Sequence, residues 1–200
     1  MDVGELEEGV DDPLARFRSW HESWVATGAP DPAAAVLATA GRDGRPSARY
    51  VNVVQVDHGF VFFTDHRTRK AADLAANPSA ALCFGFLGQD RQVRVEGTVE
   101  RLPDGECDER FAGLPRAVQV VLWASDGHSA VAGRDAVLAR VAELGERFGD
   151  GPLPRPPDWG GYRLVPEVVE LWEGRDDHVH DRVRFRRAAG GGWSVTRVAP

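Results

Sequence analysis

Residues 34–64 read AAVLATAGRDGRPSARYVNVVQVDHGFVFFT, and this stretch decides the fold class. It holds three short runs of apolar and β-branched residues, at 34–40, 48–56 and 60–64. The dipeptides Asp43-Gly44 and His58-Gly59 separate these runs, and dipeptides of this kind connect the strands of β-hairpins. The stretch therefore predicts two successive hairpins.

Runs of the same β type continue along the chain, at 80–86, 93–102, 162–165, 168–172, 179–187 and 193–198. The spacing of apolar residues, together with the Pro, Gly and Asn residues that begin or end helices, predicts helices at 13–27, 69–76, 104–112 and 130–148. The helices do not alternate with the strands as they would in a parallel sheet, and no internal repeat is present. We predict a mainly β fold with peripheral helices, in which an antiparallel barrel carries the helices on its outside.

The domain organisation is predicted from the length of the chain and from the composition of its segments. A chain of 200 residues has the length of one domain. Residues 1–12 are acidic and aperiodic, so we predict a disordered tail there. Residues 13–200 are predicted to form a single domain, in which residues 151–157 (GPLPRPP) are a stiff, extended connector.

The composition argues against several classes of protein. Lys and Arg number 24 against 31 Asp and Glu, whereas a general nucleic-acid binder needs an excess of clustered cations. No apolar stretch reaches the roughly 18–20 residues of a membrane-spanning helix. The acidic N-terminus differs from a secretory signal, and two cysteines are too few for a disulfide scaffold. We expect a cytoplasmic protein that binds neither nucleic acid nor a membrane.

Residues 64–70 (TDHRTRK) are the first candidate for a binding site. They combine three Arg or Lys side chains with two Thr hydroxyls where a predicted strand gives way to a helix. Free N–H groups at a helix start, together with Arg and Lys, can bind a phosphate. A solvated basic loop has the same composition, so these residues alone leave both interpretations open.

A second candidate lies on residues 91–97 (RQVRVEG). Alternation along a strand puts Gln92, Arg94 and Glu96 on one face. The Gln92 amide carries both donors and an acceptor, so it can bind the edge of a heteroaromatic ring. A polar outer face of a strand fits the same pattern.

A third candidate lies on residues 178–182 (HVHDR). If this segment is a strand, His178, His180 and Arg182 point the same way. No carboxylate or cysteine at a suitable spacing completes a metal site. The two imidazoles are better suited to hydrogen bonding with a substrate or an anion.

Short motifs are spread in a fixed order over residues 13–200. They are LAT at 37–39, GRPSAR at 44–49, FFTD at 62–65, TRK at 68–70, NP at 77–78, RQVR at 91–94, WAS at 123–125, PRP at 154–156, WGGY at 159–162, ELW at 170–172, HDR at 180–182 and RVAP at 197–200. In this order they resemble the pyridoxine/pyridoxamine 5′-phosphate oxidase family, with a divergence like that of its phenazine-biosynthesis members. The resemblance implies an FMN-binding split β-barrel and a homodimer with the cofactor at the subunit interface.

The resemblance also implies the residues of the FMN site. Arg69 and Lys70 match the pair that holds the FMN phosphate, and Gln92 matches a glutamine that contacts the flavin. A Gln-Ser pair that contacts the flavin from the second subunit is replaced here by Gly127-His128. The full set of matched positions is Arg49, Phe63, Thr64, Arg69, Lys70, Gln92, Trp172 and Arg182.

The matched substrate positions differ from the family pattern. Where the family holds the substrate phosphate with Lys, Tyr, Arg and Ser, this chain has Val54, Arg110, Leu114 and Val118. A phosphate dianion against three aliphatic side chains would leave buried charge unpaired. Two further substrate positions are His178, which replaces a family arginine, and His180, which is retained.

We therefore expect an FMN-dependent oxidase that removes hydride from a small cyclic or amine substrate lacking the usual phosphate, with O₂ as the acceptor. His178 and His180 are the candidate catalytic residues, because imidazole titrates near neutral pH. Natural-product biosynthesis of the phenazine kind fits such a substrate. Two alternatives stay open: a pyridoxamine/pyridoxine 5′-phosphate oxidase of vitamin B6 salvage, and a non-catalytic flavin-binding protein.

Overall fold

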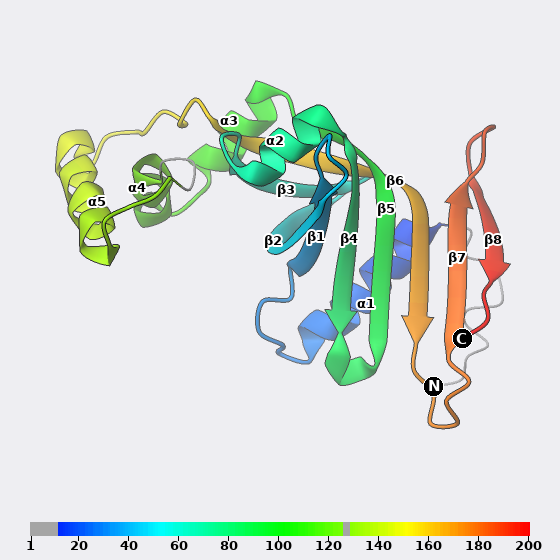
Figure 1. The fold of residues 1–200 in the computed structure, drawn as a ribbon. Coiled ribbons are helices and arrows are strands. Elements are labelled where there is room, and N and C mark those ends of the chain that lie inside the picture. The colour runs from blue at the N-terminus through cyan, green and yellow to red at the C-terminus, as the bar shows by residue number, and fades with distance from the viewer. Residues whose placement is uncertain (1–11, 126–128) are drawn as a thin grey trace.

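The protein is described by a computed structural model of residues 12–125 and 129–200, and it is a split β-barrel (Figure 1). All strands belong to one antiparallel sheet of order β3-β2-β1-β4-β5-β6-β7-β8. A further pairing of β3 with β6 closes six strands into a barrel, while β7 and β8 extend from it. The strands are β1 (Ala34–Ala40), β2 (Pro46–Val56), β3 (Phe60–Asp65), β4 (Ser79–Phe86), β5 (Arg91–Arg101), β6 (Trp159–Glu173), β7 (Asp181–Arg187) and β8 (Trp193–Arg197).

The two hairpins predicted within residues 34–64 are confirmed. In the first turn Gly44 adopts a positive φ of 72°, a conformation that suits glycine. In the second turn the Asp57 carboxylate accepts a hydrogen bond from the Gly59 N–H at 2.9 Å. Local turn chemistry therefore sets the β1–β2–β3 meander without help from distant residues.

Strand β6 corrects one prediction. The sequence indicated two runs, at 162–165 and 168–172, but the structure has one continuous strand. Its register with β5 shifts between Glu96 and Gly97, where Gly97 lies opposite Pro166. A Cβ on Gly97 would come within 2.0 Å of the Val165 carbonyl oxygen. The bulge therefore accommodates Pro166 within one continuous strand, although this proline made the sequence read as two separate runs.

The main core fills the barrel and extends to helix α1 (Pro13–Ala26). Asp12 caps this helix by accepting a hydrogen bond from the Leu14 N–H at 2.9 Å. The Phe17 ring lies with its centroid 4.6 Å from that of Phe84 and 5.0 Å from that of Phe60. Loss of such a buried ring typically lowers the free energy of unfolding by about 3–5 kcal/mol.

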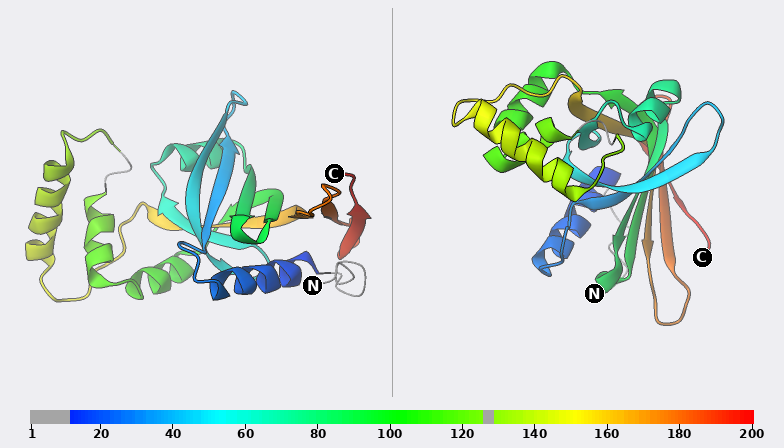
Figure 2. Two further views of the ribbon diagram at one scale, coloured as in Figure 1. Left: turned by 90° about the horizontal axis from the view of Figure 1, so that it is seen from below. Right: turned by 60° about the vertical axis from the view of Figure 1, so that its left-hand side comes forward.

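The remaining helices lie around the barrel and on one side of it. Helix α2 (Arg69–Ala76) follows β3, as predicted, and packs against β1. A short 3-10 turn, η2 (Leu87–Gln89), joins β4 to β5. Helices α3 (Asp104–Ala112), α4 (Arg116–Ala124) and α5 (Arg134–Phe148) follow β5, and α4 with α5 stands away from the barrel (Figures 1 and 2).

Helix α4 was not predicted, and α5 begins at Arg134 rather than at residue 130. The sequence of α4 contains Val118, Val120 and Val121, and β-branched residues favour strands over helices. Burial explains the outcome, because Val120 enters a second apolar cluster with Phe111, Leu144, Leu153 and Trp159. Packing outweighs the weak local preference.

Within the described ranges no helix is long and apolar enough to cross a membrane. The predicted tail at residues 1–12 lies outside the described residues except for Asp12.

Candidate functional site

Three cations from two elements, β2 and α2, meet at the start of α2, and we call Arg49, Arg69 and Lys70 the cation cluster. Arg49 on β2 donates from Nη1 to the Leu37 carbonyl at 3.1 Å and to Thr39 Oγ1 at 2.8 Å. Lys70 donates from Nζ to Thr64 Oγ1 at 2.9 Å. The sequence-predicted residues Arg49, Thr64, Arg69 and Lys70 are therefore brought together.

One carboxylate lies close to this cluster. Asp73 Oδ2 lies 4.0 Å from Arg49 Nη2 and 3.9 Å from Arg69 Nε, and it accepts a hydrogen bond from Thr39 at 2.8 Å. Neither Asp73 nor Thr39 was named from the sequence. A polar residue on a strand and an acidic residue in the following helix gave no local signal that they would join an anion site.

Burial, followed by a neighbouring cation, lowers the pKa values of two members of the cluster, Lys70 and Arg49. Burial lowers the pKa of the half-buried Lys70, the nearby Arg49 cation lowers it further, and Asp65 opposes this. Burial likewise lowers the pKa of Arg49, with Asp73 opposing and Arg69 adding to the effect. Cations held in this way gain stability when an anion arrives, which is the electrostatic behaviour of an anion-binding site.

A second group surrounds a pocket of about 340 Å³ between β2, β3 and α3, which we call the α3 pocket. Phe63 forms part of its wall and stacks on Trp159 with ring centroids 4.9 Å apart. The guanidinium carbon of Arg110 lies 6.0 Å from the centre of the Phe63 ring. The full lining is Val54, Gln55, Phe63, Leu102, Glu106, Glu109 and Arg110.

The structure thus brings Val54, Phe63 and Arg110 together, but not the other four predicted substrate positions, which are Leu114, Val118, His178 and His180. Leu114 packs against the second apolar cluster, and Val118 is exposed on α4. Neither lines the α3 pocket. Phe63 and Thr64 are consecutive on β3, so their side chains point to opposite faces and do not both present a side chain to one space.

A third group runs across three neighbouring strands. Gln92 on β5 lies opposite Trp172 on β6, and Trp172 lies opposite Arg182 on β7. The Trp172 ring packs against His180 with centroids 4.9 Å apart. We call Gln92, Trp172 and Arg182 the strand row.

Glu170 orients the arginine of the strand row. Its buried carboxylate accepts hydrogen bonds from Arg182 at 2.9 Å and from Arg184 at 2.7 Å, and Arg94 lies 3.5 Å away. Burial alone would raise the pKa of the Glu170 carboxyl, but the bonds from Arg182 and Arg184 outweigh it and lower that pKa. The sequence placed Glu170 in a family motif without a role, and only the sheet register reveals one.

The predicted strand through the two histidines is wrong. β7 begins at Asp181, so His178 and His180 lie in the preceding loop. His178 adopts a positive φ of 62°, which an extended strand does not allow. Their rings nevertheless remain near one another, with centroids 6.1 Å apart.

The strand row and the cation cluster lie far apart along β6. Thr64, which binds Lys70, pairs with Gly160 near the start of β6, whereas Trp172 stands twelve residues farther along the same strand. No hydrogen bond or ion pair joins the two groups within residues 12–125 and 129–200. Each protomer therefore offers two separate parts of the expected cofactor site.

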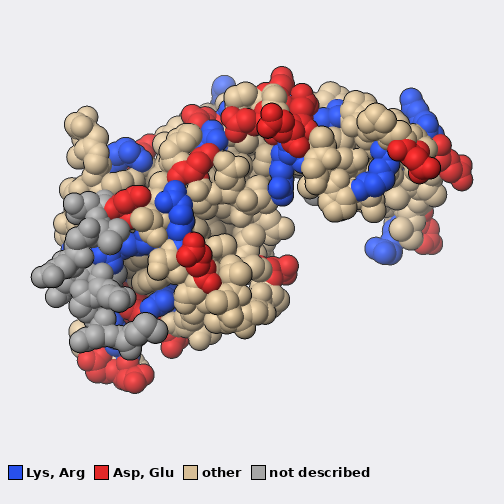
Figure 3. Space-filling view, turned by 180° about the vertical axis from the view of Figure 1, so that it is seen from behind, with Lys and Arg blue, Asp and Glu red and all other residues tan. Residues whose placement is uncertain are grey.

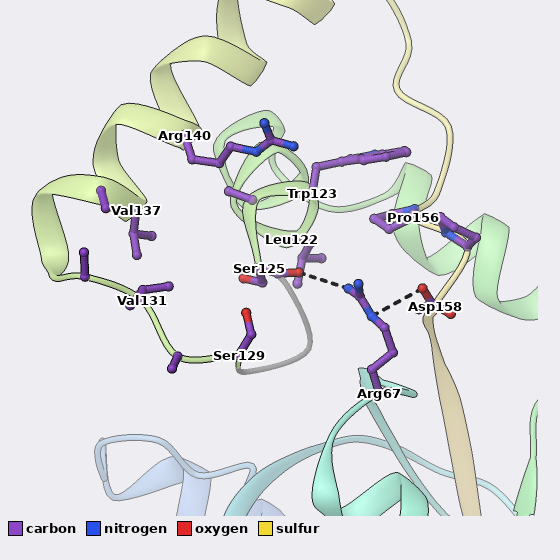
Figure 4. A pocket seen from close by; sticks show the side chains of 15 residues that line it. Arg67, Leu122, Trp123, Ser125, Ser129, Val131, Val137, Arg140, Pro156 and Asp158 are labelled. Carbon is purple, nitrogen blue, oxygen red and sulfur yellow. Dashed lines mark hydrogen bonds and ion pairs between the residues drawn. The ribbon is translucent and has the colours of Figure 1, made fainter.

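A cavity larger than the α3 pocket lies elsewhere, between α4, α5 and the segment before β6 (Figure 4). It measures about 540 Å³, and Arg67 points into it, bonded to the Ser125 carbonyl and paired with Asp158 at 3.3 Å. None of the predicted site residues lines this cavity. Gly127-His128, the predicted contact across the dimer, lies outside the described residues.

On the face shown in Figure 3, acidic and basic side chains are interspersed, and a hollow separates the barrel from the helical arm. In the described part of the chain, no group of three or more His, Cys, Asp or Glu residues is placed to hold a metal ion.

Comparison with known proteins connects these groups to a family. Residues 24–148 match a family model described as pyridoxamine 5′-phosphate oxidase. Residues 159–200 match one described as the pyridoxine 5′-phosphate oxidase C-terminal dimerisation region. Together the two matches cover most of the barrel, the helical arm and the strand row.

Individual proteins similar to this chain carry the same family name. The chain is 46% identical over 190 residues to the pyridoxine/pyridoxamine 5′-phosphate oxidase of Cupriavidus metallidurans, covering 94% of this chain and 89% of that protein. It is 47% identical over 201 residues to the enzyme of the same name from Cupriavidus necator, covering 99% and 94%.

Solved structures similar to this one include proteins of the same family. PhzG of Burkholderia lata, in complex with tetrahydrophenazine-1-carboxylic acid, superposes with a TM-score of 0.93 at 28% identity, over 100% of this chain and 98% of that one. A pyridoxamine 5′-phosphate oxidase-related, FMN binding protein of Nostoc punctiforme shares the fold, with a TM-score of 0.77 at 19% identity over 96% and 100%. The chain belongs to the pyridoxamine 5′-phosphate oxidase family.

Proposed function

We propose that this protein is a homodimeric FMN-dependent oxidase whose substrate is a small cyclic or amine compound without a phosphate group. The observation that carries the proposal is the α3 pocket, where Val54 and Leu102 are apolar lining residues and Arg110 is the only cation of a lining that also contains Glu106 and Glu109. A phosphate dianion needs more than one cation or several donors, and burial against aliphatic side chains is unfavourable.

The cation cluster fits the phosphate of FMN. Arg49 and Arg69 lie about 4 Å from the Asp73 carboxylate and Lys70 is bonded to Thr64, while burial, followed by the neighbouring cations, lowers the pKa values of Arg49 and Lys70. The Thr64 hydroxyl adds a further polar contact. When bound, FMN supplies a two-electron acceptor that takes hydride from a carbon of the substrate, and O₂ is the proposed final acceptor.

The dimer is supported by the separation of the two half-sites. The cation cluster and the strand row stand at opposite ends of β6, and Trp172 and Arg182 of the strand row lie in the region that matches the family's dimerisation model. A complete site would take the cation cluster from one protomer and Gln92, Trp172 and Arg182 from its partner.

The two histidines would have different roles. His180 Nδ1 accepts a hydrogen bond from the Arg175 N–H at 3.1 Å, so a neutral His180 carries its proton on Nε2 and acts there as a donor. His178 has no such bond in the described residues. His178 is therefore the better candidate to accept a proton, and His180 the better one to orient the substrate or the cofactor.

One test separates this proposal from vitamin B6 salvage, which the names of the relatives at 44–47% identity favour. Purified FMN-loaded protein is given pyridoxamine 5′-phosphate and O₂, and turnover is measured at steady state. We expect no turnover at micromolar substrate, and an increase in the variant Val54→Lys, which adds a cation to the α3 pocket. A micromolar KM for the unmodified protein would overturn the proposal.

A second measurement addresses a non-catalytic flavin protein. The bound flavin is monitored by its absorbance under anaerobic conditions with a panel of reduced cyclic amines. Bleaching that reverses with O₂ is expected of an oxidase. A flavin that stays oxidised with every compound would favour the non-catalytic alternative.

A further inference from the structure

The buried Thr39 side chain lies behind the cation cluster and joins Arg49 to Asp73. It stands on β1 and is only 3% exposed. Arg49 Nη1 donates to Thr39 Oγ1 at 2.8 Å, and Thr39 Oγ1 donates in turn to Asp73 Oδ2 at 2.8 Å. A guanidinium only donates and an ionised carboxylate only accepts, so the hydroxyl proton points to Asp73. We call Thr39 and Asp73 the relay pair, because they connect β1 and α2 to the arginine on β2.

The relay pair fixes one part of the Arg49 guanidinium and leaves another part available. Nη1 donates to Thr39 and also to the Leu37 carbonyl at 3.1 Å. Nη2 lies 4.0 Å from Asp73 Oδ2, which is close enough for an ion pair but too long for a hydrogen bond. Among the described residues, Nη2 donates no hydrogen bond. Its N–H groups can therefore bind an anion without giving up an existing bond.

Asp73 places a negative charge where a phosphate would gain most from positive charges alone. Its Oδ2 atom lies 4.0 Å from Arg49 Nη2 and 3.9 Å from Arg69 Nε. The carboxylate repels a phosphate, and this effect weakens the binding of the phosphate. The same carboxylate also attracts the two arginines, which would otherwise repel each other and Lys70, and this effect keeps them in place. The two effects on phosphate affinity have opposite signs, so an experiment can separate them.

Burial favours the second effect at Arg49. The side chains of Arg49 and Asp73 are 20% and 12% exposed, whereas that of Arg69 is 66% exposed. A hydrogen bond to a charged group is strong where water is largely excluded, and an exposed ion pair is weak. The other oxygen of Asp73 is also closely packed, because a Cβ on Gly41 would lie 3.1 Å from Oδ1. The relay pair therefore holds Arg49 more firmly than Asp73 holds Arg69.

We propose that Thr39 and Asp73 are positioning residues that act through Arg49 and hold its guanidinium in place for the phosphate of FMN. This inference rests on the function proposed above, and it adds two residues that act on the cofactor through another side chain. It assigns the Asp73 carboxylate a favourable effect on FMN binding, although the phosphate carries a charge of the same sign.

The experiment measures the affinity of the apoprotein for FMN and for riboflavin by the quenching of flavin fluorescence. The dissociation constant of riboflavin divided by that of FMN is the phosphate preference. In Asp73→Asn we expect this preference to fall by about tenfold, the effect of a charge-assisted hydrogen bond that is partly lost. Riboflavin affinity should change by less than about twofold. If Asp73 acted only as a nearby negative charge, the same substitution would raise the preference.

Variants of Thr39 test whether the effect passes through Arg49. Thr39→Val removes the hydroxyl and should also lower the phosphate preference by about tenfold, whereas Thr39→Ser keeps the hydroxyl and should retain most of the preference. In an Arg49→Gln background, Thr39→Val should change the preference by less than about twofold, because the arginine that Thr39 positions is absent. The Thr39 variants carry the same test if Asp73→Asn does not fold.

Asp135→Asn is the matched control, because Asp135 is an exposed carboxylate in the first turn of α5. It should leave the phosphate preference unchanged. An unchanged or raised preference in Asp73→Asn, or a full effect of Thr39→Val in the Arg49→Gln background, would overturn the inference alone. Equal affinities of the unmodified protein for riboflavin and FMN would overturn the proposed function together with the inference, and they are measured before any variant.

Discussion

Lys70 is the single lysine of the chain, and the protein holds it where its charged form is disfavoured. Its amino group is half-buried beside Arg49 and is bonded to Thr64. An arginine would keep its charge in the same place, whereas a lysine can lose its proton when crowded. The binding of an anion there is therefore linked to the protonation of Lys70.

This linkage predicts a pH dependence of FMN affinity. A bound phosphate stabilises the charged amine and raises its lowered pKa, so FMN binds best below the pKa that Lys70 has in the free protein. Affinity should fall as pH rises through that value, and Lys70→Arg should remove most of the fall. Titration of apoprotein with FMN between pH 7 and 10 tests this, with riboflavin, which lacks the phosphate, as the matched ligand. Equal slopes for both proteins would contradict the linkage.

Glu170 gives a second prediction at the scale of one residue. Its pKa in the folded protein lies below the ordinary value, so it contributes stability at neutral pH that is lost as pH falls through the folded pKa. Glu170→Gln should lower the free energy of unfolding at pH 7 by about 3–5 kcal/mol, because it leaves Arg182 and Arg184 without their buried partner.

Urea unfolding at pH 7 and at pH 4 measures both effects. The difference between Glu170→Gln and the unmodified protein should shrink at the lower pH, because the carboxylate is then partly protonated in both states. Glu143→Gln is the control, since Glu143 forms an exposed pair with Arg140. A loss of stability that stays constant with pH would show that the charge of Glu170 is unimportant.

At the scale of elements, β6 organises the molecule, because it pairs with β3, β5 and β7. Its long path carries Gly160 beside the cation cluster and Trp172 into the strand row. The bulge at Gly97 is what allows β5 to follow β6 past Pro166. The spacing of the two half-sites therefore depends on one irregularity in the sheet.

The bulge is tested with two glycines. Gly97→Ala should lower the free energy of unfolding by roughly 2–4 kcal/mol, because the new Cβ would overlap the backbone of β6. Gly105→Ala, in the first turn of α3, meets no atom within 4 Å and should be neutral or stabilise by about 0.5–1 kcal/mol. The free energy of unfolding of both variants is measured by thermal or chemical unfolding. Similar values would show that the sheet accommodates a Cβ at position 97 without loss of stability.

These elements also show what could be predicted from the sequence. The hairpins of residues 34–64 were predictable because their turns are local. The single strand β6 was not, because Pro166 is tolerated only through a bulge whose other half lies on β5. Helix α4 was missed because its valines favour a strand until Phe111 and Trp159 are placed beside them.

In the candidate site, too, local motifs were predictable and contacts between distant elements were not. Arg49, Thr64, Arg69 and Lys70 were correctly expected to meet, because family motifs carry them. Asp73 and Glu170 take part through contacts between elements, and no local pattern predicts them. The roles of the predicted site residues stay predictions until ligands are measured.

At the scale of the whole molecule, the proposed cofactor site is divided between two half-sites and would need a second copy of the chain. The helical arm of α4 and α5 stands away from the barrel (Figure 2), and Trp172 and Arg182 of the strand row lie in the part that matches a dimerisation region. A cofactor shared between protomers would stabilise the dimer by linkage, by about 2.7 kcal/mol at a hundredfold excess over Kd.

Mixed dimers test this division of the site. Lys70→Ala and Trp172→Ala should each weaken FMN binding, in different half-sites. A dimer with one protomer of each kind has one intact site and one doubly altered site, so random exchange should restore about a quarter of the sites. FMN occupancy is measured after unfolding and refolding the variants separately and together. No recovery in the mixture would show that each protomer holds its own cofactor.

The closure of the barrel by β3 and β6 has a consequence for synthesis in the cell. Phe60 pairs with Leu164, so the closing strands are 104 residues apart in the chain. At translation rates of about 5–20 residues per second, β3 waits roughly 5–20 s for its second neighbour. During that time its outer edge offers unpaired N–H and C=O groups next to Phe60 and Phe62, which is the kind of nascent segment that chaperones protect.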